Sequence, residues 1–142
     1  MKQSLIIHPI GVVHNTDEAV SVEIFAEYAD GLLGLEQFSH VNVLYWFHEN
    51  DTPEDRRTLQ VHPCGNEANP LTGVFATHAP CRPNLIALTR CRLLSVEGRH
   101  LIIDQIDAID GSPVVDIKSW FPDAPEPDVR TPHWEGRDDA EA

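Results

Sequence analysis

Basic residues are scarce in this 142-residue sequence, which has ten Lys and Arg against 23 Asp and Glu and a formal net charge of −13. Phosphate groups dominate the affinity of proteins for nucleic acids, so a broad RNA-binding surface needs a basic footprint. The composition excludes a broad footprint. Any contact with RNA is therefore confined to a small patch on an acidic body.

Cysteine is also rare, with three residues and no C-x-x-C spacing (Cys64, Cys81 and Cys91). This argues against a disulfide framework and against a four-cysteine zinc site. No apolar run approaches the ~20 residues that a membrane-spanning helix needs. The apolar stretch that starts at Leu5 ends at His8-Pro9 and is too short for a signal peptide. We therefore expect a cytoplasmic protein that does not enter a membrane.

Several motifs of common enzyme classes are missing. The sequence has no G-x-G-x-x-G, no G-x-S-x-G and no H-E-x-x-H, which argues against a Rossmann domain, a serine hydrolase and a zinc protease. The eight histidines invite a metal interpretation, but His62-Pro63-Cys64 is the only close pair of soft ligands. We therefore predict no metal site.

Apolar and β-branched stretches between turn signals predict strands. These stretches are residues 4–14, 20–25, 40–48, 73–77, 85–96, 99–106 and 113–117. In residues 40–48 both alternating faces are largely apolar, so this strand should be buried on both sides. Glu97-Gly98 separates two strands and predicts a hairpin.

The remaining segments are a short helix, loops and a tail. Leu32, Leu35 and Phe38 are spaced by three residues and predict one short helix within residues 26–38. Residues 49–58 form a polar segment that interrupts the series of predicted strands. The pattern predicts an all-β fold, a single β-barrel of about seven to eight strands over residues 1–121. A Pro-rich acidic tail is expected over residues 122–142.

Two polar segments carry residues that a plain barrel does not need. Residues 73–84 end a strand and enter a proline-stiffened loop with His78, Arg82 and Asn84, which either contacts a ligand or caps strand ends. Residues 104–118 hold Asp107 and Asp110 among four aspartates, which either accept hydrogen bonds from a ligand or stay solvated and cap turns. His48 ends the 40–48 strand, at what should be the rim of the barrel.

Four sequence blocks then resemble the TsaA/TrmO family of tRNA methyltransferases in the same order. They are IGVVHN at residues 10–15, EYADGLLGLEQFSHVNVLYWFH at 27–48, GVFATHAPCRPNLIAL at 73–88 and IDAIDGSPVVDIKSW at 106–120. The resemblance implies a TsaA-like β-barrel that binds S-adenosylmethionine as a homodimer. It also implies N6-methylation of threonylcarbamoyl-adenosine next to the anticodon of tRNA.

The resemblance also implies site residues. Those matching cofactor-binding positions of the family are His48, Glu49, His78, Leu88, Gln105, Ile106 and Asp107. Arg82, Asn84, Asp110 and Lys118 are candidates for substrate or phosphate contacts, and no catalytic residue is assigned. His78 stands where the family has an arginine, and residues 15–21 leave no room for the family's PRQ-type loop.

Two alternatives remain open at this point. The cofactor could serve methylation of a small molecule or a protein, which the acidic composition and the missing loop favour. Alternatively, the chain could be a non-catalytic S-adenosylmethionine-binding module.

Overall fold

The computed structural model describes residues 2–134, and the contacts within it group the chain into two compact units. One unit comprises Met1–Trp46 and Leu88–Phe121, and the other comprises Phe47–Ala87 and Pro122–Ala142. Residues 135–142 of the predicted tail lie outside the described part. No helix of the described residues is long and apolar enough to cross a membrane.

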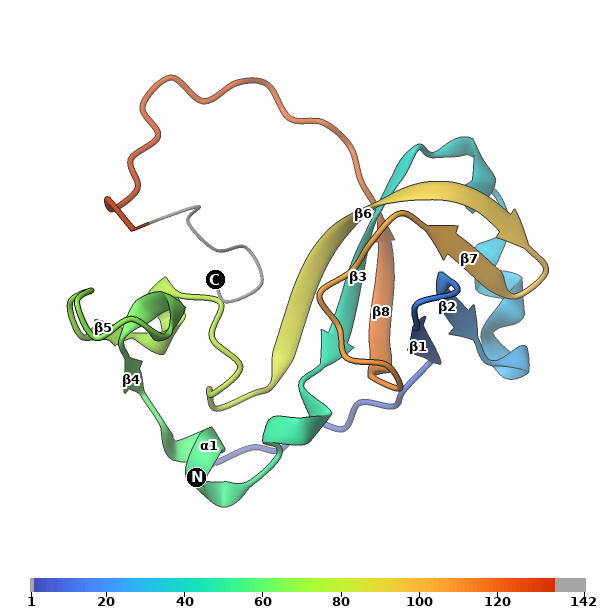
Figure 1. Cartoon of the computed structure of the whole chain (residues 1–142). Helices are drawn as coiled ribbons and strands as arrows, with labels where there is room; N and C mark the ends of the chain where they lie inside the picture. The colour runs from blue at the N-terminus through green and yellow to red at the C-terminus, as the bar shows by residue number, and fades with distance from the viewer. Residues whose placement is uncertain (1, 135–142) are drawn as a thin grey trace. The chain divides into compact units, whose positions relative to one another are not determined.

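Six strands close into a barrel in the order β1-β2-β7-β6-β3-β8 (Figure 1). Their bounds are Gly11–Asn15 for β1, Val20–Ile24 for β2, His40–Trp46 for β3, Ile86–Glu97 for β6, His100–Ile103 for β7 and Pro113–Ser119 for β8. The predicted all-β barrel is confirmed, with six strands in the barrel instead of seven or eight. Two short strands, β4 (Gln60–Val61) and β5 (Thr72–Gly73), form a separate sheet.

The barrel core is built from the inward-facing residue at every second strand position. Val13, Val22, Val43, Leu101 and Val114 each have 0% of their surface exposed. The strand β3 alternates between buried and half-buried residues. The prediction of a strand buried on both sides is therefore too strong, because the outer face of β3 keeps partial solvent access.

The hairpin around Glu97-Gly98 is confirmed. Glu97 pairs with His100 across the antiparallel strands β6 and β7, and Gly98 adopts a φ of 63° at the first turn position. A two-residue hairpin turn needs a positive φ at this position, and glycine adopts it without the steric penalty of a Cβ atom.

Four local predictions are wrong in detail. Residues 26–38 form two 3-10 helices, η1 (Ala26–Leu32) and η2 (Leu35–Gln37), instead of one helix, and Gly34 between them adopts a positive φ of 89°. Residues 4–10 are not a strand, since pairing begins at Gly11. Residues 73–77 are mostly the 3-10 helix η5 (Val74–Ala76), and residues 104–106 form a loop after β7.

The second unit contains a short helix, α1 (Pro53–Arg57), which lies within the polar segment of residues 49–58 and was not predicted. Its sequence carries the start signal of a helix. Thr52 accepts a hydrogen bond from the Asp55 backbone N–H, and Pro53 occupies the first turn. The remaining 3-10 helices of this unit are η3 (His48–Asn50) and η4 (Pro63–Gly65).

Cys91 on β6 should be chemically inert in the folded protein. It is 1% exposed, and burial raises the pKa of its thiol from 9.0 to about 12. This rise in the pKa alone lowers the thiolate fraction, and hence the alkylation rate, by roughly a thousandfold. Iodoacetamide labelling at pH 8.5, followed by mass spectrometry, should modify the partly exposed Cys64 well before Cys91. Equal native rates at the two thiols would contradict this burial, and unfolding in urea should make both reactive.

Candidate functional site

A loop over residues 104–112 joins β7 to β8 at one end of the barrel (Figure 1). Strand pairing defines which end this is. Tyr45, near the end of β3, pairs with Val114 at the start of β8, and Asp104 bonds to the backbone N–H of Arg92 on β6. The loop therefore lies where β1, β3 and β7 end and where β6 and β8 begin.

Asn15, the last residue of β1, holds this loop in place. Its side-chain Nδ2 donates to the carbonyl of Ile106 at 3.1 Å and to that of Ala108 at 2.8 Å. Its backbone N–H donates to Asp110 Oδ1 at 2.9 Å. Ile106 and Ala108 are themselves buried, at 7% and 2% exposed. The loop is therefore fixed at several points along its length, and its outward residues have a defined position.

The turn at Asp110-Gly111 completes the attachment. Gly111 has a φ of 87°, and its N–H donates to the carbonyl of Val13 at 2.8 Å. Because one oxygen of Asp110 accepts the Asn15 N–H, the geometry gives this carboxylate a positioning role in the turn.

Burial alternates along the loop, so two predicted residues face outward. Gln105 and Asp107 are exposed, whereas Ile106 faces the interior. Asp107 lies close enough to Tyr45 to act on its ionisation. Burial raises the pKa of Tyr45 first, and the negative charge of Asp107 raises it further. The Tyr45 hydroxyl lies 3.1 Å from the hydroxyl of Thr89, and this hydrogen bond acts against the rise in the pKa.

Leu88 begins the part of β6 that belongs to the same unit. Its side chain is 59% exposed on the outer face of the strand, whereas Thr89 is partly buried next to Tyr45. Arg90 and Arg92 follow on the same outer face and are exposed. The outer face of β6 therefore presents an apolar side chain followed by two cations, and the Arg90 guanidinium lies 4.6 Å from the centre of the Trp120 ring.

The structure brings Leu88, Gln105, Ile106 and Asp107 to one end of the barrel and separates Lys118 from them. Lys118 pairs with Asn42 near the start of β3, four residues beyond Val114 on β8. At a strand rise of about 3.3 Å per residue, it lies roughly 13 Å further along the barrel.

The other predicted residues belong to the second unit. Glu49 and His78 are exposed and His48 is partly exposed. Arg82 Nη1 donates to the carbonyls of Thr77 and Ala79 at 3.1 and 3.0 Å, and so closes the loop that contains His78.

Asn84 lies beside helix α1. Its Oδ1 accepts from Arg56 Nη2 at 3.5 Å, and Arg56 Nε also donates to the carbonyl of Pro83 at 3.0 Å. The structure therefore gives both Arg82 and Asn84 contacts that hold the 77–84 segment together.

Three residues at the barrel end were absent from the predicted set. Asn15, Tyr45 and Thr89 hold or line the 104–112 loop region. Tyr45 could have been found from the strand alternation, which places it on the same face as Val41 and Val43. Asn15 ends the IGVVHN block, but nothing local shows its role, because its partners lie more than 90 residues away.

A hollow of about 680 Å³ in the barrel unit contains none of the predicted residues. Its walls come from η1, η2 and β8, including Tyr28, Leu33 and Phe38. The block at residues 27–48 thus forms a second concave surface apart from the 104–112 loop.

Comparison with known proteins identifies the family. Residues 7–126 match the tRNA-methyltransferase O N-terminal domain. The chain belongs to this family. A probable S-adenosyl-L-methionine-binding protein of Pyrococcus horikoshii is 46% identical over 112 residues, which cover 79% of each chain. The tRNA (adenine(37)-N6)-methyltransferase of Mus musculus is 42% identical over 110 residues, which cover 78% of this chain and 25% of the mouse protein.

A solved structure shares the fold. The crystal structure of TrmO from Pseudomonas aeruginosa superimposes with a TM-score of 0.70 at 27% identity, over 94% of this chain and 62% of that chain. This chain therefore spans less than two thirds of that TrmO chain. The tRNA-methyltransferase O match extends over both compact units, and it includes the 104–112 loop and all of the predicted site residues.

Proposed function

We propose that this protein is an S-adenosylmethionine-dependent methyltransferase that methylates N6 of threonylcarbamoyl-adenosine next to the anticodon of tRNA. The observation that carries the proposal is the fixed 104–112 loop, which presents Gln105 and Asp107 at the barrel end beside β6. Relatives named for S-adenosylmethionine binding and for tRNA adenine methylation support the cofactor and the substrate class.

The residues at this barrel end fit the adenosyl part of the cofactor. The exposed carboxylate of Asp107 can accept hydrogen bonds from ribose hydroxyls, and the amide of Gln105 can both donate and accept. Leu88 and Ile109 are 59% and 51% exposed and offer apolar surface to an adenine ring. Small-molecule sites combine apolar walls with a few placed polar groups, and this set has both.

When bound, the cofactor supplies a methyl group on a positively charged sulfonium, which is already activated for in-line displacement. The chain then has to hold the acceptor in position and exclude water. An N6 amine needs an acceptor for its proton, and with Asp107 on the ribose, the exposed carboxylate of Asp110, which the Asn15 N–H holds through Oδ1, is the candidate for this task.

Contact with tRNA needs cations near the site, although the net charge is −13. Arg90 and Arg92 lie exposed on the outer face of β6 directly after Leu88. We infer that this pair receives phosphates beside the cofactor. A small patch on an acidic body should bind RNA weakly and with a shallow dependence on salt, because the steepness of that dependence grows with the number of phosphates contacted and few are contacted here.

Asp107→Asn should weaken S-adenosylmethionine binding by about tenfold or more. The substitution keeps the shape but removes the charge that strengthens hydrogen bonds to hydroxyl groups. Isothermal titration calorimetry of the wild type and the variant measures the loss. Asp30→Asn in η1 is the matched control, since it neutralises an exposed carboxylate near the opposite end of the barrel. Equal weakening in both variants would show a general charge effect and contradict the assignment.

Transfer from radiolabelled S-adenosylmethionine to tRNA with and without the threonylcarbamoyl group tests the substrate. We expect labelling of the modified tRNA and a product with a methylated N6. Binding of the cofactor without transfer to any tRNA would reject the tRNA role and favour a small-molecule substrate or a binding module. Sedimentation of the same preparation tests the homodimer that we propose for the active form. The proposal places the protein in the cytoplasm with its tRNA.

A further inference from the structure

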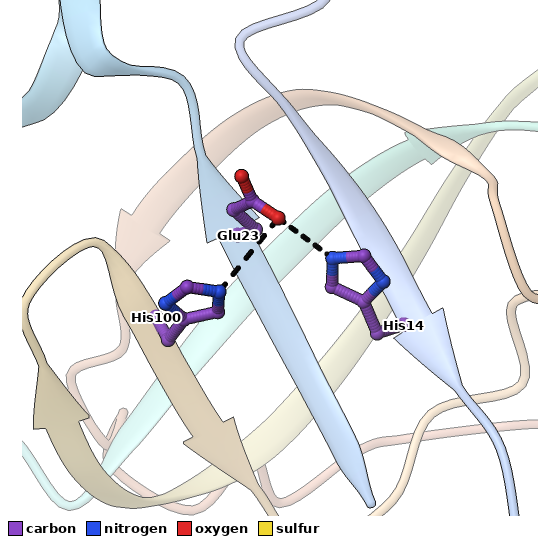
Figure 2. Close-up of side chains that lie close together, drawn as sticks. All are labelled: His14, Glu23 and His100. Carbon is purple, nitrogen blue, oxygen red and sulfur yellow. Dashed lines mark hydrogen bonds and ion pairs between the residues drawn. The ribbon is translucent and has the colours of Figure 1, made fainter.

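Three polar side chains meet on the outer face of the barrel, and none of them belongs to the loop discussed above. His14 comes from β1, Glu23 from β2 and His100 from β7, and these strands are neighbours (Figure 2). Glu23 lies directly opposite His100 in the antiparallel register, and His14 is the diagonal neighbour of Glu23. Three paired strands therefore fix the backbone beneath all three side chains.

The two imidazoles converge on one carboxylate oxygen. His14 Nε2 lies 2.8 Å from Glu23 Oε1, and His100 Nε2 lies 3.7 Å from the same oxygen. One ligand atom from each residue lies within 4.8 Å of the others. The imidazole rings are 6.3 Å apart between centroids and inclined by 29°.

The distances between these ligand atoms fit a metal-binding site. With metal–ligand bonds of about 2.0–2.1 Å, neighbouring ligand atoms lie about 2.9 Å apart in an octahedral site and about 3.4 Å apart in a tetrahedral one. The two measured distances to Glu23 Oε1 bracket this range. The third distance joins the two imidazole nitrogens, and it shortens when the rings rotate toward each other. Both side chains have room for this rotation because they are 43% and 44% exposed.

We propose that His14, Glu23 and His100 form a binding site for a divalent transition-metal ion of the Zn²⁺ type. Two imidazoles and one carboxylate select such ions over Mg²⁺ and Ca²⁺, which prefer sites made entirely of oxygen atoms. The chain supplies three ligands, and water completes the coordination. His14 then binds through Nε2 with its proton on Nδ1, the tautomer opposite to the one that donates to Glu23.

Arg99 shapes this site through the other carboxylate oxygen. Its Nη1 lies 3.5 Å from Glu23 Oε2 and donates to the carbonyl of Ile24 at 2.8 Å. The guanidinium therefore orients the carboxylate and leaves Oε1 to the histidines. The positive charge of Arg99 also lowers the affinity for a cation, so the site should bind a metal ion more weakly than the same three ligands would without Arg99.

A bound ion would cross-link β1, β2 and β7, although His14 and His100 are separated by 85 residues of intervening sequence. Ligands that bind the folded state alone stabilise it by mass action, so the metal should raise the melting temperature. This role in stability does not depend on the proposed methyl transfer. The sequence contained no signal for it, because the ligands are too far apart for any known metal-binding motif.

Calorimetric titration of the full chain without a histidine tag, with ZnCl₂ after treatment with EDTA, tests the proposal. We expect one equivalent of Zn²⁺ to bind, and at least about tenfold weaker binding in H14A and in H100A. H8A is the matched control, since His8 is exposed and lies outside the cluster. Unchanged zinc affinity in H14A and H100A, or no binding by the wild type, would overturn the proposal.

Two further measurements keep the test decisive if an alanine variant fails to fold. E23Q keeps the size of the side chain and should abolish the rise in melting temperature that Zn²⁺ produces in the wild type. Addition of CoCl₂ to the wild type should give a visible absorption band that one equivalent of Zn²⁺ removes. A melting shift that persists in E23Q, or the absence of any cobalt band, counts against the site.

Discussion

Replacing Gly11 by alanine should destabilise the barrel by about 3 kcal/mol and lower the melting temperature by about 10 °C. Gly11 starts β1, where it pairs with Ile24 on β2 and with Val114 on β8. A Cβ atom added at Gly11 would collide with the backbone carbonyl oxygen of Glu23 and lie 3.2 Å from the Ile24 Cα. Backbone atoms cannot rotate away as a side chain can, so the strands themselves would have to separate.

Urea and thermal unfolding followed by circular dichroism measure the loss. Gly31→Ala is the matched control, because an added Cβ at Gly31 meets nothing within 4 Å. Its effect should stay within about 0.5 kcal/mol, since it changes mainly the entropy of the unfolded chain. If Gly11→Ala were as mild as Gly31→Ala, β1 and β2 would not approach as closely as the structure shows.

Gly11 also shows where sequence reasoning reaches its limit. The Ile-Gly pair could be recognised as part of a family block, but nothing in its neighbourhood shows why glycine is needed. The reason is a long-range approach between strands, which depends on closure of the barrel. By contrast, the β6–β7 hairpin and the Asp110-Gly111 turn could be predicted, because their causes lie within a few residues.

The candidate site likewise has a part that local sequence predicts and a part that depends on long-range contacts. Asp107 could be placed on a polar segment after a strand, whereas Gln105 fell inside the predicted 99–106 strand, and the resemblance gave both a role. Their geometry depends on Asn15, about 90 residues earlier in the sequence, and on the buried anchors Ile106 and Ala108. The metal-binding cluster is the extreme case, because its three residues become neighbours through strand pairing alone. Local patterns therefore predict the elements of this fold, and closure of the barrel creates its sites.

Asn15→Ala should destabilise the protein by about 2 kcal/mol and also weaken S-adenosylmethionine binding by about tenfold. The carbonyls of Ile106 and Ala108 lose their hydrogen-bond donor, and both residues are buried. An unsatisfied buried carbonyl costs about 1–3 kcal/mol, so the loop should relax toward solvent. Ordering a relaxed loop then reduces the free energy available for the ligand.

Two measurements separate the positioning role of Asn15 from direct contact with the ligand. Amide hydrogen exchange should show faster exchange over residues 104–112 in Asn15→Ala, while the core strands keep their protection. Asn42→Ala on β3 is the control, because it truncates an asparagine that pairs with Lys118, away from the loop. Saturating S-adenosylmethionine should restore part of the protection in Asn15→Ala, because binding and ordering of the loop are coupled. Unchanged exchange in the loop together with weakened binding would instead mean that Asn15 contacts the cofactor itself.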